Sequence, residues 1–371
     1  TGTRVNEDYL IEDVPYNFAV YSEDFTQSNY SKTRCTVTAN QAIAPDGTLT
    51  ADLMTATGDD ARLDDQVTNS GQKYTQSIYV KSAQATDVAG QIDFAGANIV
   101  TFTATDRWQR ITSTLTDTTI NPRVRVRITN NGDALHIWGA QVVKGDQPKE
   151  YLKTTDRLDI PRIDYTNGEP SILLEPSRTN LIANSTTTIA NNTTIEYNNI
   201  LSPENILNGV KVTSTASSAY VRTDTVAMTS NNTISVFLKA GTSNYVQVLG
   251  AGNAGDFFNI NLENFTVGNT GATTSNVTIQ QYSNDWYRCS AKFAGYTGNT
   301  TIRLLLSDSD SNYNATSSTT GKFLYYYGLQ LETGSYATSL IHTSGSTVTR
   351  SADAANNAGN SDLINSTEGV I

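Results

Sequence analysis

The sequence predicts an all-β protein, built from two tandem antiparallel jelly-roll β-sandwiches that are joined by a linker containing a β-hairpin. The chain has 371 residues, which is a comfortable length for two domains. Its short segments alternate between apolar and polar residues with a period of two, as half-buried strands do. The same sequence landmarks also occur twice in the same order, which indicates that one kind of domain is repeated.

Three pairs of landmarks carry the repeat. Two blocks align without a gap: residues 137–155 (IWGAQVVKGDQPKEYLKTT) and residues 326–344 (YYGLQLETGSYATSLIHTS). Two further pairs precede them: residues 74–82 (YTQSIYVKS) with 232–240 (NTISVFLKA), and residues 107–115 (RWQRITSTL) with 285–293 (DWYRCSAKF). Each pair falls at the same place in its copy, so the two copies are expected to share one topology.

The alternation within each copy predicts which side chains face the core. In residues 74–81, Tyr74, Ile78 and Val80 lie on one face. Residues 123–129 (RVRVRIT) are expected to turn their aliphatic side chains inward and their three arginines outward. Residues 252–276 are an addition to the second copy, rich in Gly and Asn, and predict a further strand pair. No segment shows the pattern of an amphipathic helix of three turns.

These patterns divide the chain into five predicted parts: an N-terminal connector (1–16), β-sandwich 1 (17–155), a linker hairpin (156–179), β-sandwich 2 (180–343) and a C-terminal connector (344–371). The first 25 residues look like a degraded version of the junction that precedes the second sandwich. Junctions and domains therefore alternate along the chain.

The central junction, residues 161–182 (PRIDYTNGEPSILLEPSRTNLI), is predicted to be a rigid spacer. Its three prolines fix backbone angles, and Asn167-Gly168 favours a two-residue hairpin turn. Three consecutive apolar side chains require burial against a neighbouring domain or chain: Ile172, Leu173 and Leu174. Its charged residues are expected to form ion pairs: Arg162 and Arg178 with Asp164, Glu169 or Glu175.

The composition argues against several classes of function. The net charge is −11 and the sequence has no Lys/Arg cluster, so nucleic acid is not expected as a partner. It has no run of about 18 apolar residues, so no membrane insertion is expected. The first twenty residues carry four acidic residues and no apolar core, so no signal peptide is expected. Cys35 and Cys289 lie in different repeats and are predicted to be buried free thiols, as in a protein folded in a reducing compartment.

Several strings resemble the carbohydrate-binding-module-like sandwiches of tailed-phage virion proteins, the class of tail fibres, tail spikes and head fibres. They are the central junction, residues 25–54 (FTQSNYSKTRCTVTANQAIAPDGTLTADLM), RWQRIT (107–112) and residues 328–353 (GLQLETGSYATSLIHTSGSTVTRSAD). The resemblance implies a structural protein of the virion surface that attaches to host-surface glycans. The alternative is a head-fibre, decoration or adaptor protein with a purely structural role. By analogy, the expected partners are other copies of the chain in a homotrimer, other virion proteins and a glycan.

The sequence nominates no catalytic residues. Its two histidines, His136 and His342, have no partner that is repeated across the copies, so an enzyme is not expected. No cofactor is expected, although a structural calcium stays open as an alternative, with residues 58–65 and 307–314 as its oxygen-rich candidates.

Sugar binding requires an aromatic face beside polar side chains. Trp108 and Trp286 occupy matching places in the two copies, which favours a structural role for both. The candidates for ligand binding are aromatic residues near turns that differ between the copies, and aromatic residues that alternate along one strand: Tyr245, Phe257, Phe258, Tyr325 and Tyr327.

Overall fold

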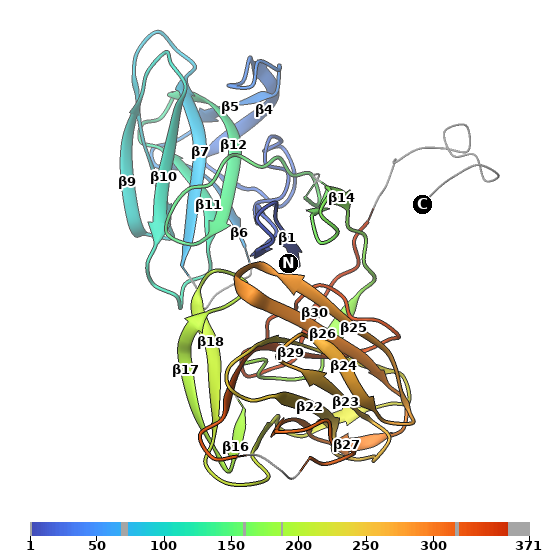
Figure 1. Cartoon of the computed structure of the whole chain (residues 1–371). Coiled ribbons are helices and arrows are strands. Elements are labelled where there is room, and N and C mark those ends of the chain that lie inside the picture. Colours follow the sequence, from blue (N-terminus) through green and yellow to red (C-terminus); the bar gives the residue numbers. More distant parts are fainter. Residues whose placement is uncertain (1, 68–72, 159–160, 187, 316–318, 355–371) are drawn as a thin grey trace, which may run out of the picture. The chain divides into compact units, whose positions relative to one another are not determined.

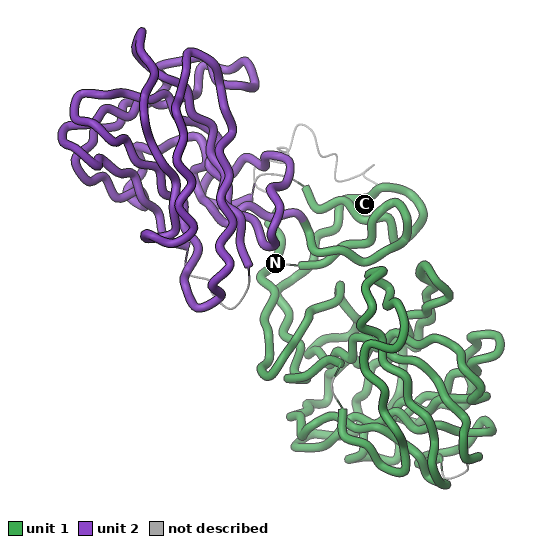
Figure 2. Tube along the Cα trace, turned by 90° about the vertical axis from the view of Figure 1, so that its left-hand side faces the viewer, with its two compact units in different colours: residues 1–14, 161–371 green, residues 15–160 purple. Residues whose placement is uncertain are grey.

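The computed structural model describes residues 2–67, 73–158, 161–186, 188–315 and 319–354. They form two units, each with its own core (Figure 2). Unit 2 is Pro15–Ile160, and unit 1 is made of Thr1–Val14 together with Pro161–Ile371. Unit 2 is therefore an insertion in the sequence of unit 1, and most of the predicted N-terminal connector and of the linker belongs to unit 1.

Unit 2 is a sandwich of two five-stranded antiparallel sheets (Figure 1). The first sheet has the order β10 (Gln109–Leu115), β7 (Tyr74–Ser82), β12 (Ala134–Lys144), β5 (Ala51–Ala56) and β4 (Cys35–Ala42). The second has the order β3 (Ser31–Thr33), β6 (Ala61–Gln66), β11 (Arg123–Ile128), β8 (Val88–Phe94) and β9 (Ala97–Ala104). Alternate side chains from both sheets, among them Tyr74, Ile78 and Val80, fill the core between them, as the sequence predicts.

Unit 1 repeats this sandwich with six strands in each sheet. The first sheet has the order β17 (Thr193–Leu201), β18 (Leu207–Ser214), β29 (Phe323–Thr333), β21 (Asn232–Lys239), β26 (Trp286–Phe293) and β25 (Thr274–Tyr282). The second has the order β16 (Ile189–Asn191), β19 (Tyr220–Arg222), β28 (Ile302–Ser307), β22 (Tyr245–Gly250), β23 (Phe257–Asn261) and β24 (Thr266–Thr270). Compared with unit 2, each sheet of unit 1 has one additional edge strand, β24 in the second sheet and β25 in the first.

Four two-stranded pairs complete unit 1: β1 (Thr3–Val5) with β2 (Ile11–Asp13), β13 (Ile163–Asp164) with β14 (Ser171–Ile172), β15 (Arg178–Asn180) with β30 (Val348–Arg350), and β20 (Val226–Met228) with β27 (Gly298–Thr300). The only helical element of the described residues is a single 3₁₀ turn, Ser283–Asp285. No helix in this part of the chain is long and apolar enough to cross a membrane. The predicted fold class, all-β with two antiparallel sandwiches and a hairpin in the linker, is confirmed.

The arginines of β11 correct the simple inside–outside prediction. They lie on the face opposite the core, yet Arg123 and Arg125 are only 9% and 8% exposed. Arg125 bonds Asp64 at 2.9 Å and Asp93 at 3.3 Å, and Arg123 also pairs with Asp64 at 3.1 Å. Alternation correctly identifies the face on which these arginines lie. It does not reveal their burial, because the acids that cover them come from the neighbouring strands β6 and β8.

The junction hairpin forms, but its predicted turn is wrong. The ladder closes at the pair Asp164–Ser171, so the connecting loop is longer than two residues. Gly168 N donates to Tyr165 O at 2.9 Å, with Gly168 at a φ of 90°. Pro170 has no N–H to extend the ladder toward the turn, which accounts for the longer loop.

The apolar run of the junction is divided between burial and exposure. Leu173 is half-buried, whereas Ile172 and Leu174 are 63% and 58% exposed. Both cysteines are free and buried, as predicted. Residues 355–371 of the predicted C-terminal connector lie outside the described residues.

Candidate functional site

The candidate site lies on the outer face of the first sheet of unit 1. Along β21, Ile234, Val236 and Leu238 point into the core. The alternate residues Ser235 and Phe237 therefore point to the opposite face. The same alternation places Arg288 of β26 and Gln280 of β25 on that outer face, beside one another at the edge of the sheet.

The segment after β29 folds back over this face and is fixed by two buried polar side chains. Gln330 Oε1 accepts from Ile341 N at 2.6 Å, and its Nε2 donates to Ser339 O at 3.1 Å. Glu332 Oε2 accepts from Thr338 N at 3.0 Å. These bonds hold residues 335–340 against the sheet and create two adjoining hollows beneath and beside the segment.

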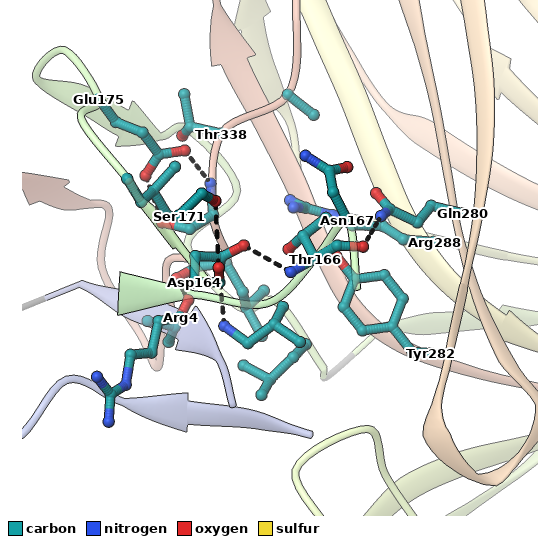
Figure 3. A pocket seen from close by; sticks show the side chains of 17 residues that line it. Arg4, Asp164, Thr166, Asn167, Ser171, Glu175, Gln280, Tyr282, Arg288 and Thr338 are labelled. Carbon is teal, nitrogen blue, oxygen red and sulfur yellow. Dashed lines mark hydrogen bonds between the residues drawn. The ribbon is translucent and has the colours of Figure 1, made fainter. Parts of the chain in front are cut away.

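The first hollow, of about 230 Å³, lies between the junction hairpin, β1 and the outer face (Figure 3). Its polar groups are largely bonded to one another. Asp164 accepts from Val5 N at 2.8 Å and from Thr166 N at 2.9 Å, and Gln280 Nε2 donates to Thr166 O at 2.9 Å. With these donors and acceptors already occupied, this hollow is a structural seam between the junction and the sheet.

An ion-pair network, which we call the junction network, borders that seam. Glu175 accepts from Ser339 N at 2.7 Å and pairs with Arg162 at 2.7 Å and Arg350 at 2.9 Å. Asp353 faces both arginines. Burial opposes ionisation, but the Ser339 hydrogen bonds and the two arginines outweigh it and hold the pKa of Glu175 below its usual range. The predicted pair between Arg162 and Glu175 is confirmed.

The second hollow is an open groove of about 460 Å³, which we call the polar groove. It is lined by eight residues: Asn276, Thr278, Gln280, Arg288, Ser290, Ser335, Tyr336 and Ala337. Amide, hydroxyl and guanidinium groups dominate this lining, and none of the eight residues is acidic. The groove therefore offers many hydrogen-bond donors and acceptors but only one charge.

Tyr336 supplies the aromatic surface of the polar groove. Its side chain is 51% exposed, whereas Phe237 and Tyr327 on the first sheet of unit 1 are buried. The Arg178 guanidinium lies 5.5 Å from the centroid of its ring, a cation–π arrangement that orients it. An exposed ring beside a polar lining is the combination that sugar binding requires.

Arg288 lines the polar groove and also borders the first hollow. Its Nη2 donates to Ser235 Oγ at 3.0 Å, and its guanidinium lies 5.3 Å from the Phe237 ring centroid. Within the described residues no carboxylate pairs with it. Its Nε is buried and has no hydrogen-bond partner there.

Comparison with known proteins adds little to this geometry. No family model and no curated protein matches the chain. Among solved structures, the N-terminal CBM22-1–CBM22-2 tandem domain of Paenibacillus barcinonensis Xyn10C is similar over 87% of this chain and 97% of its own, at 12% identity and a TM-score of 0.28. The CBM22-1 xylan-binding domain of the same protein covers 36% of this chain and 95% of its own, at 14% identity and a TM-score of 0.27. Scores this low identify neither a ligand nor an activity.

The five aromatic residues singled out from the sequence lie elsewhere. Phe257 and Phe258 are buried, in a side cluster and in the main core of unit 1. Tyr327 is also buried, and its hydroxyl donates to Glu204 at 2.7 Å. These three rings present no open face, because the strands that carry them are covered on both sides. Tyr245 and Tyr325 are half-buried and stay as predictions.

The sequence alone does not identify Tyr336, Gln280 and Arg288 as site residues. Tyr336 lies in the repeated closing block and Arg288 in the repeated DWYR landmark, and such repetition indicates a role in the fold. Trp286 in the same landmark is structural, as predicted: it is buried and donates to Leu201 O at 2.9 Å. The half-buried Trp108 makes the equivalent bond to Ile43 O at 3.1 Å.

The acids of the two calcium candidates have protein partners. In the first candidate, Asp64 pairs with Arg123 and Arg125, and Asp60 pairs with Arg127 at 2.9 Å. In the second, Asp310 accepts from Asn259 at 2.7 Å. The described residues contain no group of three or more His, Cys, Asp or Glu side chains placed to hold a metal ion.

Proposed function

We propose that unit 1 binds a glycan in the polar groove and that the chain serves as a surface protein of a tailed-phage virion. The observation that carries the first part is the exposed Tyr336 ring beside the polar lining contributed by β25 and β26. A sugar ring has an apolar C–H face that stacks on an aromatic ring and hydroxyl groups that bond amides, hydroxyls and guanidinium groups. The groove supplies both kinds of contact in one place.

The virion part of the proposal rests on the sequence resemblance to fibre and spike sandwiches. In that setting the glycan belongs to the host surface, the chain assembles as a homotrimer, and other virion proteins flank it. The exposed Ile172 and Leu174 of the junction hairpin support self-association, because burial between chains would remove their apolar surface from water.

Binding of the full chain to a glycan array tests the function directly. We expect a defined set of glycans to bind, and we expect Tyr336→Ala to weaken that binding about tenfold, equivalent to about 1.4 kcal/mol. Tyr197→Ala is the matched control, since Tyr197 is also exposed, at 45%, but does not line the groove. Equal losses for both variants, or no loss for Tyr336→Ala, would count against the groove as the binding site.

A purely structural role is the second candidate, and the junction network favours it. Glu175 and Arg162 of the central junction and Arg350 of the C-terminal segment form one buried cluster. Arg162 Nη1 also donates to Thr3 O at 2.9 Å, so the N-terminal segment joins the same cluster. Ion pairs and hydrogen bonds thus connect the N-terminal segment, the central junction and the C-terminal segment, which are far apart in the sequence. A protein whose role is to hold domains at a fixed spacing requires such connections. A folded chain that binds nothing on the array would favour this candidate.

A further inference from the structure

We infer that the ligand of the polar groove is an acidic sugar whose carboxylate binds Arg288. This inference rests on the proposed glycan binding and narrows it to one class of ligand. It is carried by the charge of the groove, by the surroundings of Arg288 and by the difference between the two copies of the sandwich.

The charge of the groove is opposite to that of the chain. The chain carries a net charge of −11, yet among the described residues the only charged side chain that lines the groove is that of Arg288. Arg178 adds a second cation against the Tyr336 ring. Neither arginine has a carboxylate partner in the part of the chain that the structure describes, whereas Arg162 and Arg350 nearby both pair with Glu175.

The contacts of Arg288 leave its charge uncompensated. Ser235 and Tyr282 place neutral hydroxyls beside the guanidinium, and the Phe237 ring lies against it. A half-buried guanidinium is screened less by water than an exposed one, so an anion gains more from binding there. The planar fork of a guanidinium matches the two oxygens of a carboxylate, which uronic sugars carry and neutral sugars lack.

The equivalent arginine of unit 2 already donates its hydrogen bonds to neighbouring residues of the same unit. Arg110 occupies the same place in the repeat, and its Nη2 donates to Ser77 Oγ at 3.0 Å, to Gln141 Oε1 at 2.7 Å and to Lys149 O at 2.8 Å. In unit 1 the counterpart of Gln141 is Gln330, whose Oε1 accepts from Ile341 N instead. Arg288 of unit 1 therefore lacks the glutamine contact that Arg110 makes in unit 2. It faces the open polar groove instead.

The test uses matched pairs of oligosaccharides and the full chain. Hexamers of galacturonate, glucuronate and mannuronate would be compared with their carboxyl-reduced forms by isothermal titration calorimetry. We expect at least one acidic hexamer to bind roughly tenfold tighter than its reduced form, with an advantage that shrinks as salt is added. Arg288→Gln should abolish this difference, and Arg288→Lys should keep part of it. Arg110→Gln is the matched control and should change neither affinity, with thermal unfolding confirming that every variant folds.

The outcomes separate the two proposals. If acidic and reduced hexamers bind equally well, or if Arg288→Gln keeps the preference, the acidic-sugar inference is overturned while glycan binding stands. If no hexamer binds in either form and the glycan array is also empty, both proposals fail.

Discussion

Replacing Glu175 by Gln tests whether the junction network holds unit 1 together. The wild-type carboxylate receives four donors: Ser339 N and Oγ at 2.7 Å each, Arg162 at 2.7 Å and Arg350 at 2.9 Å. A carboxamide keeps one acceptor oxygen but turns an NH₂ group toward the cluster, where donors already abound. Two arginines whose side chains are 6% and 3% exposed then share one remaining acid, Asp353.

The expected cost follows from that burial. Breaking one side of a buried ion pair costs about 3–5 kcal/mol, and we take about 3 kcal/mol because Asp353 still faces both arginines. For a domain the size of unit 1, that loss lowers the unfolding midpoint by roughly 6–12 °C. Differential scanning calorimetry of the full chain at pH 7 would measure it, and the transition of unit 2 provides an internal reference.

Two comparisons make the result decisive. Glu169→Gln alters an exposed acid in the same hairpin and should leave the midpoint unchanged. Because the folded-state pKa of Glu175 is lowered, its stabilisation is present above the unfolded pKa and is lost as the pH falls through the folded one. The difference between wild type and Glu175→Gln should therefore shrink in acid. A midpoint within about 2 °C of wild type at pH 7 would refute the reasoning, since that is under 1 kcal/mol for a domain of this size.

Three further predictions concern other parts of the chain. Asp64→Asn should destabilise unit 2 by about 2–4 kcal/mol in urea unfolding, because it breaks the pair with the buried Arg125. Burial acts to raise the pKa of Asp64, but the arginines outweigh it and lower that pKa. The loss of stability should therefore fade below about pH 4. Gly328→Ala should destabilise unit 1 by at least 1 kcal/mol, because Gly328 has a φ of 60° and an added Cβ would lie 2.9 Å from the Leu340 side chain. Light scattering at micromolar concentration should report a trimer, and the double change Ile172→Ser and Leu174→Ser should shift it toward monomer at an unchanged unfolding midpoint; a wild-type monomer would contradict this.

The fold was predictable from the sequence because its signals are local. Alternation along residues 74–81 and the repeated landmarks depend only on neighbouring residues, and both are confirmed. The strand pair predicted within residues 252–276 is present as β23 and β24. Where the partners come from distant segments, the sequence was less informative: the arginines of β11 are covered by acids of β6 and β8, which alternation within β11 cannot reveal.

The candidate site was not predictable for the same reason. Phe258 lies near a predicted turn and Tyr327 alternates along a strand, which made both candidates for exposure, but packing on both faces of the sheets buries them. Tyr336 and Arg288 are 48 residues apart in sequence. They line the same groove only because the segment after β29 folds back over the sheet edge. That fold-back depends on Gln330 and Glu332, whose polar side chains give no sign of burial in the sequence.

A crystal structure of the full chain with the tightest-binding glycan of the array tests the central claim most directly. We expect the sugar in the polar groove, with one ring against Tyr336 and its polar groups within hydrogen-bond distance of Gln280 and Arg288. Sugar bound instead at Tyr245 or Tyr325, or on unit 2, with the groove empty, would contradict the account.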